Sequence, residues 1–203
     1  MEEQQMGERK IYIVLTDTGT VFTRLIKLYT KSPYNHVSVA FDKQLKEIYS
    51  FGRKNPHNPF FAGFVRENIE SRLFQRAACQ IYGMAVTESE YNQLVGYIEQ
   101  LKKNHKKYKY NLIGLFGIMF NIEIHRKYAY FCSQFIATLF FKCGIPLTEK
   151  SPNLTTPDDI RKSNKLCLEY EGKLSAYLFS RNIRLSGTRN KLVSFAGEEA
   201  GLG

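Results

Sequence analysis

Short apolar runs separated by turns predict a set of β-strands along the chain. Residues 11–15 form a β-branched run of the kind found in buried strands. Residues 36–41 alternate between large and small side chains, and residues 47–51 return after a turn, which predicts a β-hairpin. Residues 77–86 predict another strand. The strands lie close together in sequence, so we expect an antiparallel sheet.

Helical patterns follow the first strand and fill the second half of the chain. Residues 21–29 have helical spacing with basic residues between the apolar ones, which favours either a helix packed on the sheet or one on a membrane surface. Thr87 and Glu90 have the form of a capping box, and the helix they open runs to about Lys103. Residues 111–120 predict an apolar helix.

Two further helices have clear boundary signals. From Ser133 the apolar residues recur at helical spacing until Gly144 ends the helix, and Tyr130, Phe131 and Cys132 stand at its start. Thr156 followed by Pro157 and two acids predicts the start of another helix.

The remaining segments are interpreted as loops and a tail. Residues 53–64 contain prolines and an apolar stretch, which indicates a loop of the kind that flanks a pocket. Residues 166–170 and 174–178, on either side of Glu171 and Gly172, predict a late hairpin. We expect a single α+β domain over residues 1–180, and weak order in residues 181–203.

Composition narrows the class of protein. Of the 203 residues, 43% are hydrophobic and none is Trp, which is typical of a globular chain. No apolar run reaches the roughly 20 residues that span a bilayer, and no signal peptide is seen, so we expect a cytoplasmic protein, peripheral to a membrane at most. The net charge of +10 favours an anionic membrane surface or polymer as partner, or simply a solvated basic surface. No motif for sequence-specific nucleic-acid binding is present.

One of the four cysteines has the context of a nucleophile. The cysteines and histidines lack zinc-ligand spacing, so we expect neither a metal nor another cofactor. A helix N-terminus lowers the pKa of a thiol, because its unpaired N–H groups and dipole favour an anion. Only Cys132 stands at such a start; Cys79 lies in a strand pattern, Cys143 at a helix end, and Cys167 begins a late strand.

His36 is the best candidate partner for Cys132. It opens a predicted strand after a turn, and Ser38 and Ala40 on the same face are small enough to leave room for a facing thiol. Taken singly, each residue also fits an ordinary structural role.

Both segments resemble those of a known family. The sequence Asn35-His36-Val37-Ser38-Val39-Ala40-Phe41-Asp42 with its returning strand, and Tyr130-Phe131-Cys132-Ser133-Gln134-Phe135-Ile136, are similar to the histidine hairpin and nucleophile segment of the circularly permuted NlpC-type papain-like peptidases. These include the YiiX-like proteins and relatives of lecithin:retinol acyltransferase. The order of histidine before cysteine is that of the permuted members, and the likeness spans roughly residues 11–159.

The resemblance implies a permuted papain-like fold and a thiolate–imidazole dyad. His36 would accept the proton of Cys132 and later protonate the leaving group. The backbone N–H of Cys132 would form part of an oxyanion hole, and the Asn35 amide would bind the oxyanion or a substrate carbonyl, unless Asn35 is only a turn residue. A third residue would orient the ring from the returning strand. Tyr49 is favoured, then Ser50 and Glu47, with Glu47 and Tyr49 on one face and Ser50 on the other.

The resemblance leaves the reaction open. A cysteine hydrolase acting on a peptide amide or lipid acyl bond is favoured, with an acyltransferase or thioesterase as the alternative within the same fold. A non-enzymatic basic membrane-binding module is the third hypothesis. Residues 60–64 and 111–120 would line an acyl groove, or else pack in the core.

Overall fold

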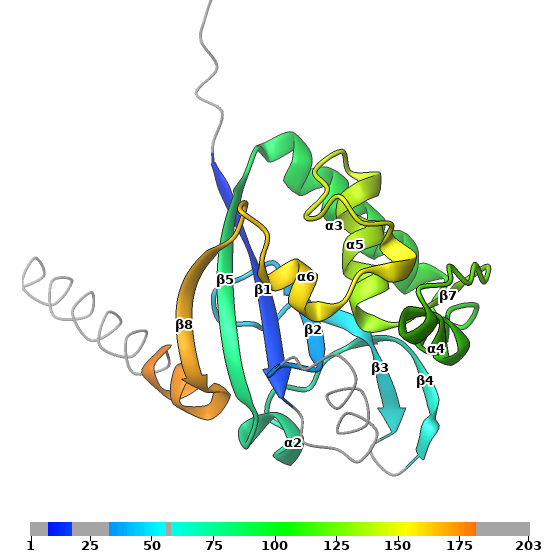
Figure 1. The fold of residues 1–203 in the computed structure, drawn as a ribbon. Coiled ribbons are helices and arrows are strands. Elements are labelled where there is room, and N and C mark those ends of the chain that lie inside the picture. Colours follow the sequence, from blue (N-terminus) through cyan, green and yellow to red (C-terminus); the bar gives the residue numbers. More distant parts are fainter. Residues whose placement is uncertain (1–7, 18–32, 56–57, 182–203) are drawn as a thin grey trace, which may run out of the picture.

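The computed structural model describes residues 8–17, 33–55 and 58–181, and its centre is a six-stranded sheet (Figure 1). The strand order is β4-β3-β2-β1-β5-β8, and every neighbouring pair is antiparallel. The strands are β1 (Arg9–Asp17), β2 (His36–Ala40), β3 (Ile48–Asn55), β4 (Asn58–Arg66), β5 (Ala78–Val86) and β8 (Cys167–Lys173). The expected α+β class with an antiparallel sheet is confirmed.

Two apolar clusters cover the two faces of this sheet. On one face, alternate residues such as Ile13 of β1 pack against α3 (Glu88–Lys103) and α5 (Cys132–Lys142), which lie together in Figure 1. On the other face, Val14 and its neighbours pack against Phe74 of α2 (Arg72–Gln75) and Tyr177 of a helical segment at 174–181. Burial on both faces explains why β1 is apolar at every position over residues 11–15.

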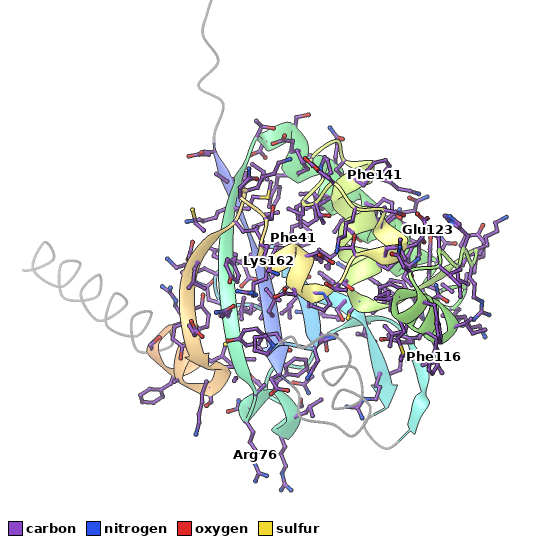
Figure 2. All side chains as sticks on the ribbon, in the orientation of Figure 1. Phe41, Arg76, Phe116, Glu123, Phe141 and Lys162 are labelled. Atoms are coloured by element: carbon purple, nitrogen blue, oxygen red, sulfur yellow. The ribbon has the colours of Figure 1, made fainter. Side chains whose placement is uncertain are left out.

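Helix α5 is the most buried helix of the described part, and it begins at Cys132. Phe131 is extended at the N-cap, and its N–H donates to the side-chain oxygen of Gln134 at 3.3 Å. Gly144 closes the helix with a positive φ of 75°. Phe141, near the C-terminal end of α5, lies at one end of the molecule, whereas Arg76 beside α2 lies at the other (Figure 2).

A smaller unit lies beside α5. The short strands β6 (Lys109–Tyr110) and β7 (Ala129–Tyr130) pair in parallel, and α4 (Leu112–Phe120) lies between them in sequence. A 3₁₀ turn at Pro152–Leu154 leads to α6 (Pro157–Arg161). The capping box predicted at Thr87 is present, and the helix start predicted at Thr156 is present too, with a capping box of its own.

Two sequence predictions are wrong. The loop expected over residues 53–64 is mostly strand. β4 is an edge strand, and an edge strand tolerates a proline because one of its sides makes no ladder hydrogen bonds. The late hairpin is instead strand β8, running through Glu171 and Gly172, followed by a helix in which Leu174 and Tyr177 face the core at helical spacing.

Some expectations lie outside the described residues. The helix expected over residues 21–29 and most of the tail at 181–203 fall there, as does His57. Among the residues that are described, no helix has both the length and the apolar character needed to cross a membrane.

Candidate active site

Cys132 and His36 meet although 95 residues separate them in sequence. Each is the first residue of its element, Cys132 of α5 and His36 of β2, and they lie close enough that Cys132 raises the pKa of the His36 ring. The cysteine is only 5% exposed, and the histidine side chain is 13% exposed. The other three cysteines lie elsewhere: Cys79 and Cys143 are buried, and Cys167 is exposed on β8.

A carboxylate that sequence reasoning missed completes the group. Glu67 directly follows β4, and its Oε1 lies 2.7 Å from Nε2 of His36. The backbone N–H of Glu67 donates to the carbonyl of Ile48 at 3.0 Å, which fixes Glu67 beside β3. Since Nε2 faces this carboxylate, Nδ1 is the ring nitrogen left for the thiol. A prediction of residues 58–66 as a strand, paired so that Tyr49 lies opposite Arg66, would have placed Glu67 here.

Ser50 is the member of the expected trio that touches the histidine. The pairing of Ala40 with Ile48 and the alternation of side chains place His36, Ser38 and Ser50 on one face of the hairpin. The Ser50 hydroxyl donates to Oε1 of Glu67 at 2.7 Å and lies 3.1 Å from Nε2 of His36. The Ser38 hydroxyl is 3.4 Å from the same nitrogen. Ser50 therefore holds the carboxylate against the ring.

Tyr49 and Glu47 have other contacts. As expected, they share the opposite face from Ser50, and the Tyr49 hydroxyl donates to the Glu47 carboxylate. The Tyr49 ring stacks on Phe64 with centroids 5.8 Å apart, and Glu47 forms an ion pair with Arg66 at 2.8 Å. The role of orienting the ring, assigned first to Tyr49, falls instead to Glu67 and Ser50.

Asn35 is buried beside the histidine but faces β1. Its side-chain N–H donates to Oδ1 of Asp17 at 2.7 Å, and its backbone N–H donates to the carbonyl of Thr16 at 3.2 Å. These bonds attach the start of β2 to the end of β1, which sets the position of His36.

The electrostatics of the site favour a charged imidazole. Burial alone would lower the pKa of His36, but hydrogen bonds to Cys132 and Glu67, together with the negative charge of these groups, raise the pKa to about 10. Tyr110 is also a neighbour of Cys132. Burial and the charge of Cys132 raise the pKa of the Tyr110 hydroxyl, while the positive charge of Arg53 lowers it. The arrangement can therefore hold an imidazolium beside Cys132 at neutral pH.

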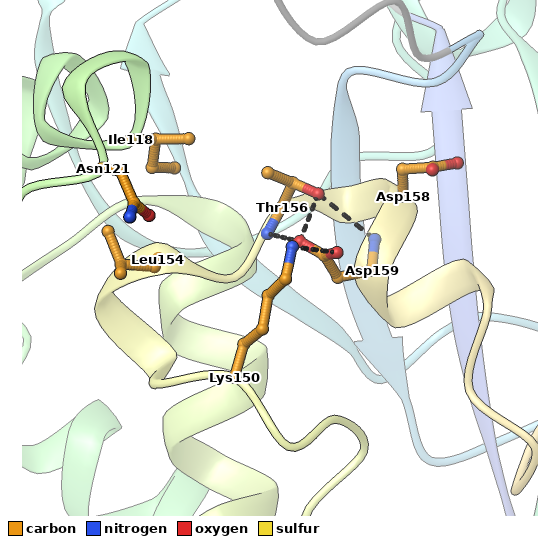
Figure 3. A pocket seen from close by; sticks show the side chains of 7 residues that line it. All are labelled: Ile118, Asn121, Lys150, Leu154, Thr156, Asp158 and Asp159. Atoms are coloured by element: carbon orange, nitrogen blue, oxygen red, sulfur yellow. Dashed lines mark hydrogen bonds and ion pairs between the residues drawn. The ribbon is translucent and has the colours of Figure 1, made fainter.

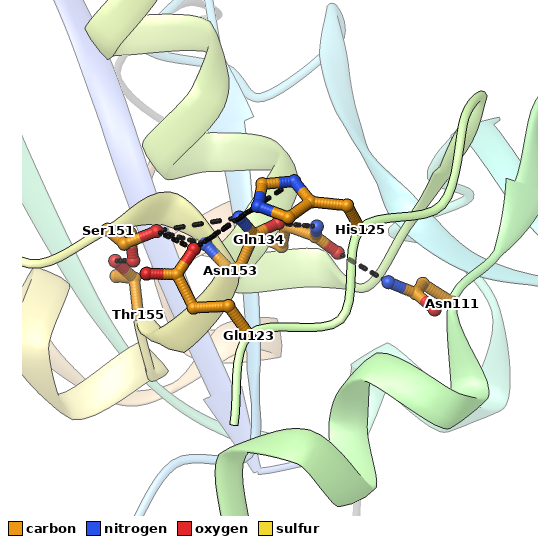
Figure 4. Close-up of polar contacts among 7 residues, drawn as sticks. All are labelled: Asn111, Glu123, His125, Gln134, Ser151, Asn153 and Thr155. Carbon is orange, nitrogen blue, oxygen red and sulfur yellow. Dashed lines mark hydrogen bonds and ion pairs between the residues drawn. The ribbon is translucent and has the colours of Figure 1, made fainter. Parts of the chain in front are cut away.

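A chain of amide side chains holds the first turn of α5 (Figure 4). The Gln134 side chain accepts from Nδ2 of Asn111 at 3.2 Å and donates to Oδ1 of Asn153 at 2.7 Å. Beside it, the Ser133 hydroxyl donates to the carbonyl of Thr155 at 2.7 Å. These contacts join α4 and the segment before α6 to the helix that begins at Cys132.

A second histidine cluster in Figure 4 has a different character. The Asn153 amide and the Ser151 hydroxyl both donate to the Glu123 carboxylate, at 3.0 and 2.9 Å. His125 lies 3.4 Å from the same carboxylate, but its side chain is 77% exposed. Because Ser151 donates to the acid rather than to the histidine, this group does not have the arrangement of a Ser–His nucleophile pair.

A pocket of about 430 Å³ lies nearby, between α4 and α6 (Figure 3). Its charged groups are already engaged: Lys150 forms an ion pair with Asp159 at 2.6 Å, and Asp159 also accepts from Thr156. The lining contains none of Cys132, His36 and Glu67, so this pocket is separate from the site.

Comparisons with known proteins do not assign the chain to a family. No protein-family model matches the chain, and no curated protein matches its sequence. In the described part of the chain, no three His, Cys, Asp or Glu side chains come together in a way that could hold a metal ion.

Proposed function

We propose that the protein is a cysteine hydrolase with a permuted papain-like fold, which cleaves an amide or acyl bond through the Cys132 thiolate. The observation that carries the proposal is the series of contacts from Cys132 to His36 to Glu67, with Ser50 on the carboxylate. The order of elements supports the proposal. The strand with His36 comes first in the sequence, and the later helix that begins at Cys132 packs on the same sheet.

The reaction would proceed in two halves. The Cys132 sulfur attacks the carbonyl carbon, and the negative oxygen that forms is stabilised by N–H groups in the first turn of α5, which have no acceptor within the helix. The imidazolium of His36 then gives its proton to the leaving amine or alcohol, and a thioester remains on Cys132. In the second half, His36 takes a proton from water, the hydroxide attacks the thioester, and the acid is released as the thiol leaves.

The proposal is tested by alkylation of the four thiols at pH 6, followed by mass spectrometry. An ordinary thiol is only about 0.3% thiolate at this pH, whereas Cys132 paired with imidazolium should react with iodoacetamide at least tenfold faster than the others. Burial raises the pKa of Cys79 to about 12 and also raises that of Cys143, so these two should stay unmodified.

The exposed Cys167 is the competitor that matters, and the Cys167→Ser variant provides the control. Selective modification of Cys132 should persist in Cys167→Ser and disappear in His36→Ala. Equal reactivity of Cys132 and Cys167 in the unmodified chain would refute the proposal.

The same variants distinguish hydrolysis from transfer. Incubation with acyl-lipid and γ-glutamyl-peptide libraries, read by mass spectrometry, should release free acids in the unmodified chain and none in Cys132→Ala. Movement of the acyl group to an alcohol or amine acceptor instead would identify an acyltransferase. No turnover of any substrate together with unselective thiols would leave the non-enzymatic basic module as the remaining function.

A further inference from the structure

Helix α4 turns its large apolar side chains outward. Its nine residues, LIGLFGIMF, are all apolar or glycine, yet its buried positions are only Gly114 and Gly117. Ile113, Phe116 and Phe120 are 53%, 54% and 70% exposed. A surface helix of a globular protein usually has the opposite arrangement, with apolar residues inward and charged residues outward.

Close packing under the two glycines fixes this orientation. A Cβ atom at Gly117 would lie 2.5 Å from the carbonyl oxygen of Ile122, and one at Gly114 would lie 2.2 Å from the Asn111 amide. The two glycines therefore face the chain segments that enter and leave the helix, where no larger side chain would fit, and the large apolar residues lie on the exposed side. Figure 2 shows Phe116 projecting from α4 at the edge of the molecule.

The apolar surface continues past the helix and is bordered by cations. Ile122 and Tyr128 are 58% and 42% exposed. Because Lys109 pairs with Ala129 in the parallel β6–β7 ladder, the basic residues before α4 lie beside those before β7. These exposed basic residues are Lys106, Lys107, Lys109, Arg126 and Lys127.

We propose that this surface, consisting of the exposed apolar residues of α4 with Ile122, Tyr128 and the five basic residues, docks on an anionic lipid bilayer. An apolar face inserts among acyl chains while bordering lysines and arginines contact acidic headgroups, which is the chemistry of interfacial helices. The net charge of +10 supports the same partner. Glu123 is the one acidic residue between the two basic segments, and its carboxylate accepts hydrogen bonds from Ser151 and Asn153.

The docked surface would lie close to the candidate active site. The backbone N–H of Asn111, which caps α4, donates to the carbonyl of Tyr130 at 3.0 Å, two residues before Cys132. Docking would thus bring the N-terminus of α5 near the bilayer. Docking requires no chemistry at Cys132, so its test is independent of the proposed hydrolysis.

The absence of Trp from the chain allows a direct test. A Phe120→Trp variant carries a single fluorophore on the surface, and Phe141→Trp, at a phenylalanine of similar exposure (62%) on the far end of α5, is its control. Vesicles of phosphatidylcholine mixed with phosphatidylserine should shift the emission of Phe120→Trp to the blue and leave Phe141→Trp unchanged. Phosphatidylcholine alone should give a much weaker shift.

Further substitutions separate the two components of binding. Phe116→Ser, at an exposed position that should tolerate it, is expected to weaken vesicle binding by about tenfold, with the fold checked by circular dichroism. Replacing Lys106 and Lys107 by Ser should weaken binding only to vesicles that contain phosphatidylserine. No shift of Phe120→Trp, or equal shifts of both tryptophans, would overturn the proposal. A blue shift that grows with protein concentration without vesicles, with a dimer mass by light scattering, would do the same.

Discussion

At the scale of single residues, the proton on His36 is the centre of the site. Burial disfavours the charged ring, while Cys132 and Glu67 favour it, and the outcome is a pKa of about 10. Ser50 holds the Glu67 carboxylate in place, because its hydroxyl donates to the same oxygen that faces Nε2. An imidazolium at neutral pH suits the step in which a leaving group must be protonated.

Glu67→Gln should therefore lower the pKa of His36, because a neutral amide no longer stabilises the charged ring. An NMR titration of the imidazole carbons checks this, with the His36 signal identified by its loss in His36→Gln. Glu70→Gln removes an exposed acid three residues further on and should leave the titration unchanged. The same midpoint in Glu67→Gln and in the unmodified chain would show that Glu67 does not hold the proton.

At the scale of elements, local signals were sufficient wherever one short segment determined the structure. The alternation at 36–41, the capping boxes at Thr87 and Thr156, and the helix start at Cys132 are each specified by neighbouring residues. Strand β4 could not be predicted in this way, since prolines at and before its start indicate a loop, and a proline is tolerated in a strand at the sheet edge. The strand predicted in the segment that forms a helix over residues 174–181 was wrong, because a short apolar run fits a strand and a helix equally well.

The first turn of α5 also gives a prediction at this scale. Gln134 is buried, and its side chain accepts hydrogen bonds from Phe131 and Asn111 and donates one to Asn153. Gln134→Leu keeps the volume but removes the acceptor of two buried donors, the Phe131 N–H and the Asn111 amide, so we expect a loss of about 2–4 kcal/mol in the free energy of unfolding. Denaturant titration measures it, and iodoacetamide modification of Cys132 should slow in the folded variant.

Gln100→Leu is the matched control for that change. Gln100 is exposed on α3, so its replacement should alter the free energy of unfolding by no more than about 0.5 kcal/mol. Equal effects of the two substitutions would show that the hydrogen bonds of the Gln134 side chain do not stabilise the helix that begins at Cys132.

At the scale of the whole molecule, the site exists only when three distant elements are assembled. Cys132 comes from α5, His36 from β2, and Glu67 from the end of β4. Sequence patterns could indicate the first two, because each opens an element of recognisable type. The position of Glu67 depends on the register between β3 and β4 and on the contact between that hairpin and His36, which no local pattern contains.

Since unfolding separates the three groups, the stability of the whole chain should depend on the protonation of His36. The pKa of this residue is raised from 6.5 to about 10 on folding. Its contribution is therefore fully present below pH 6.5, decreases above that value, and is lost as pH rises through about 10. Thermal unfolding of the unmodified chain and of His36→Gln between pH 6 and pH 10.5 isolates this term, because the other titrating groups are common to both. The difference in stability between the two should be largest at the acid end and should shrink towards pH 10. A difference that stays constant over this range would mean that folding does not raise the pKa of His36, and the imidazolium assigned to the site would have to be abandoned.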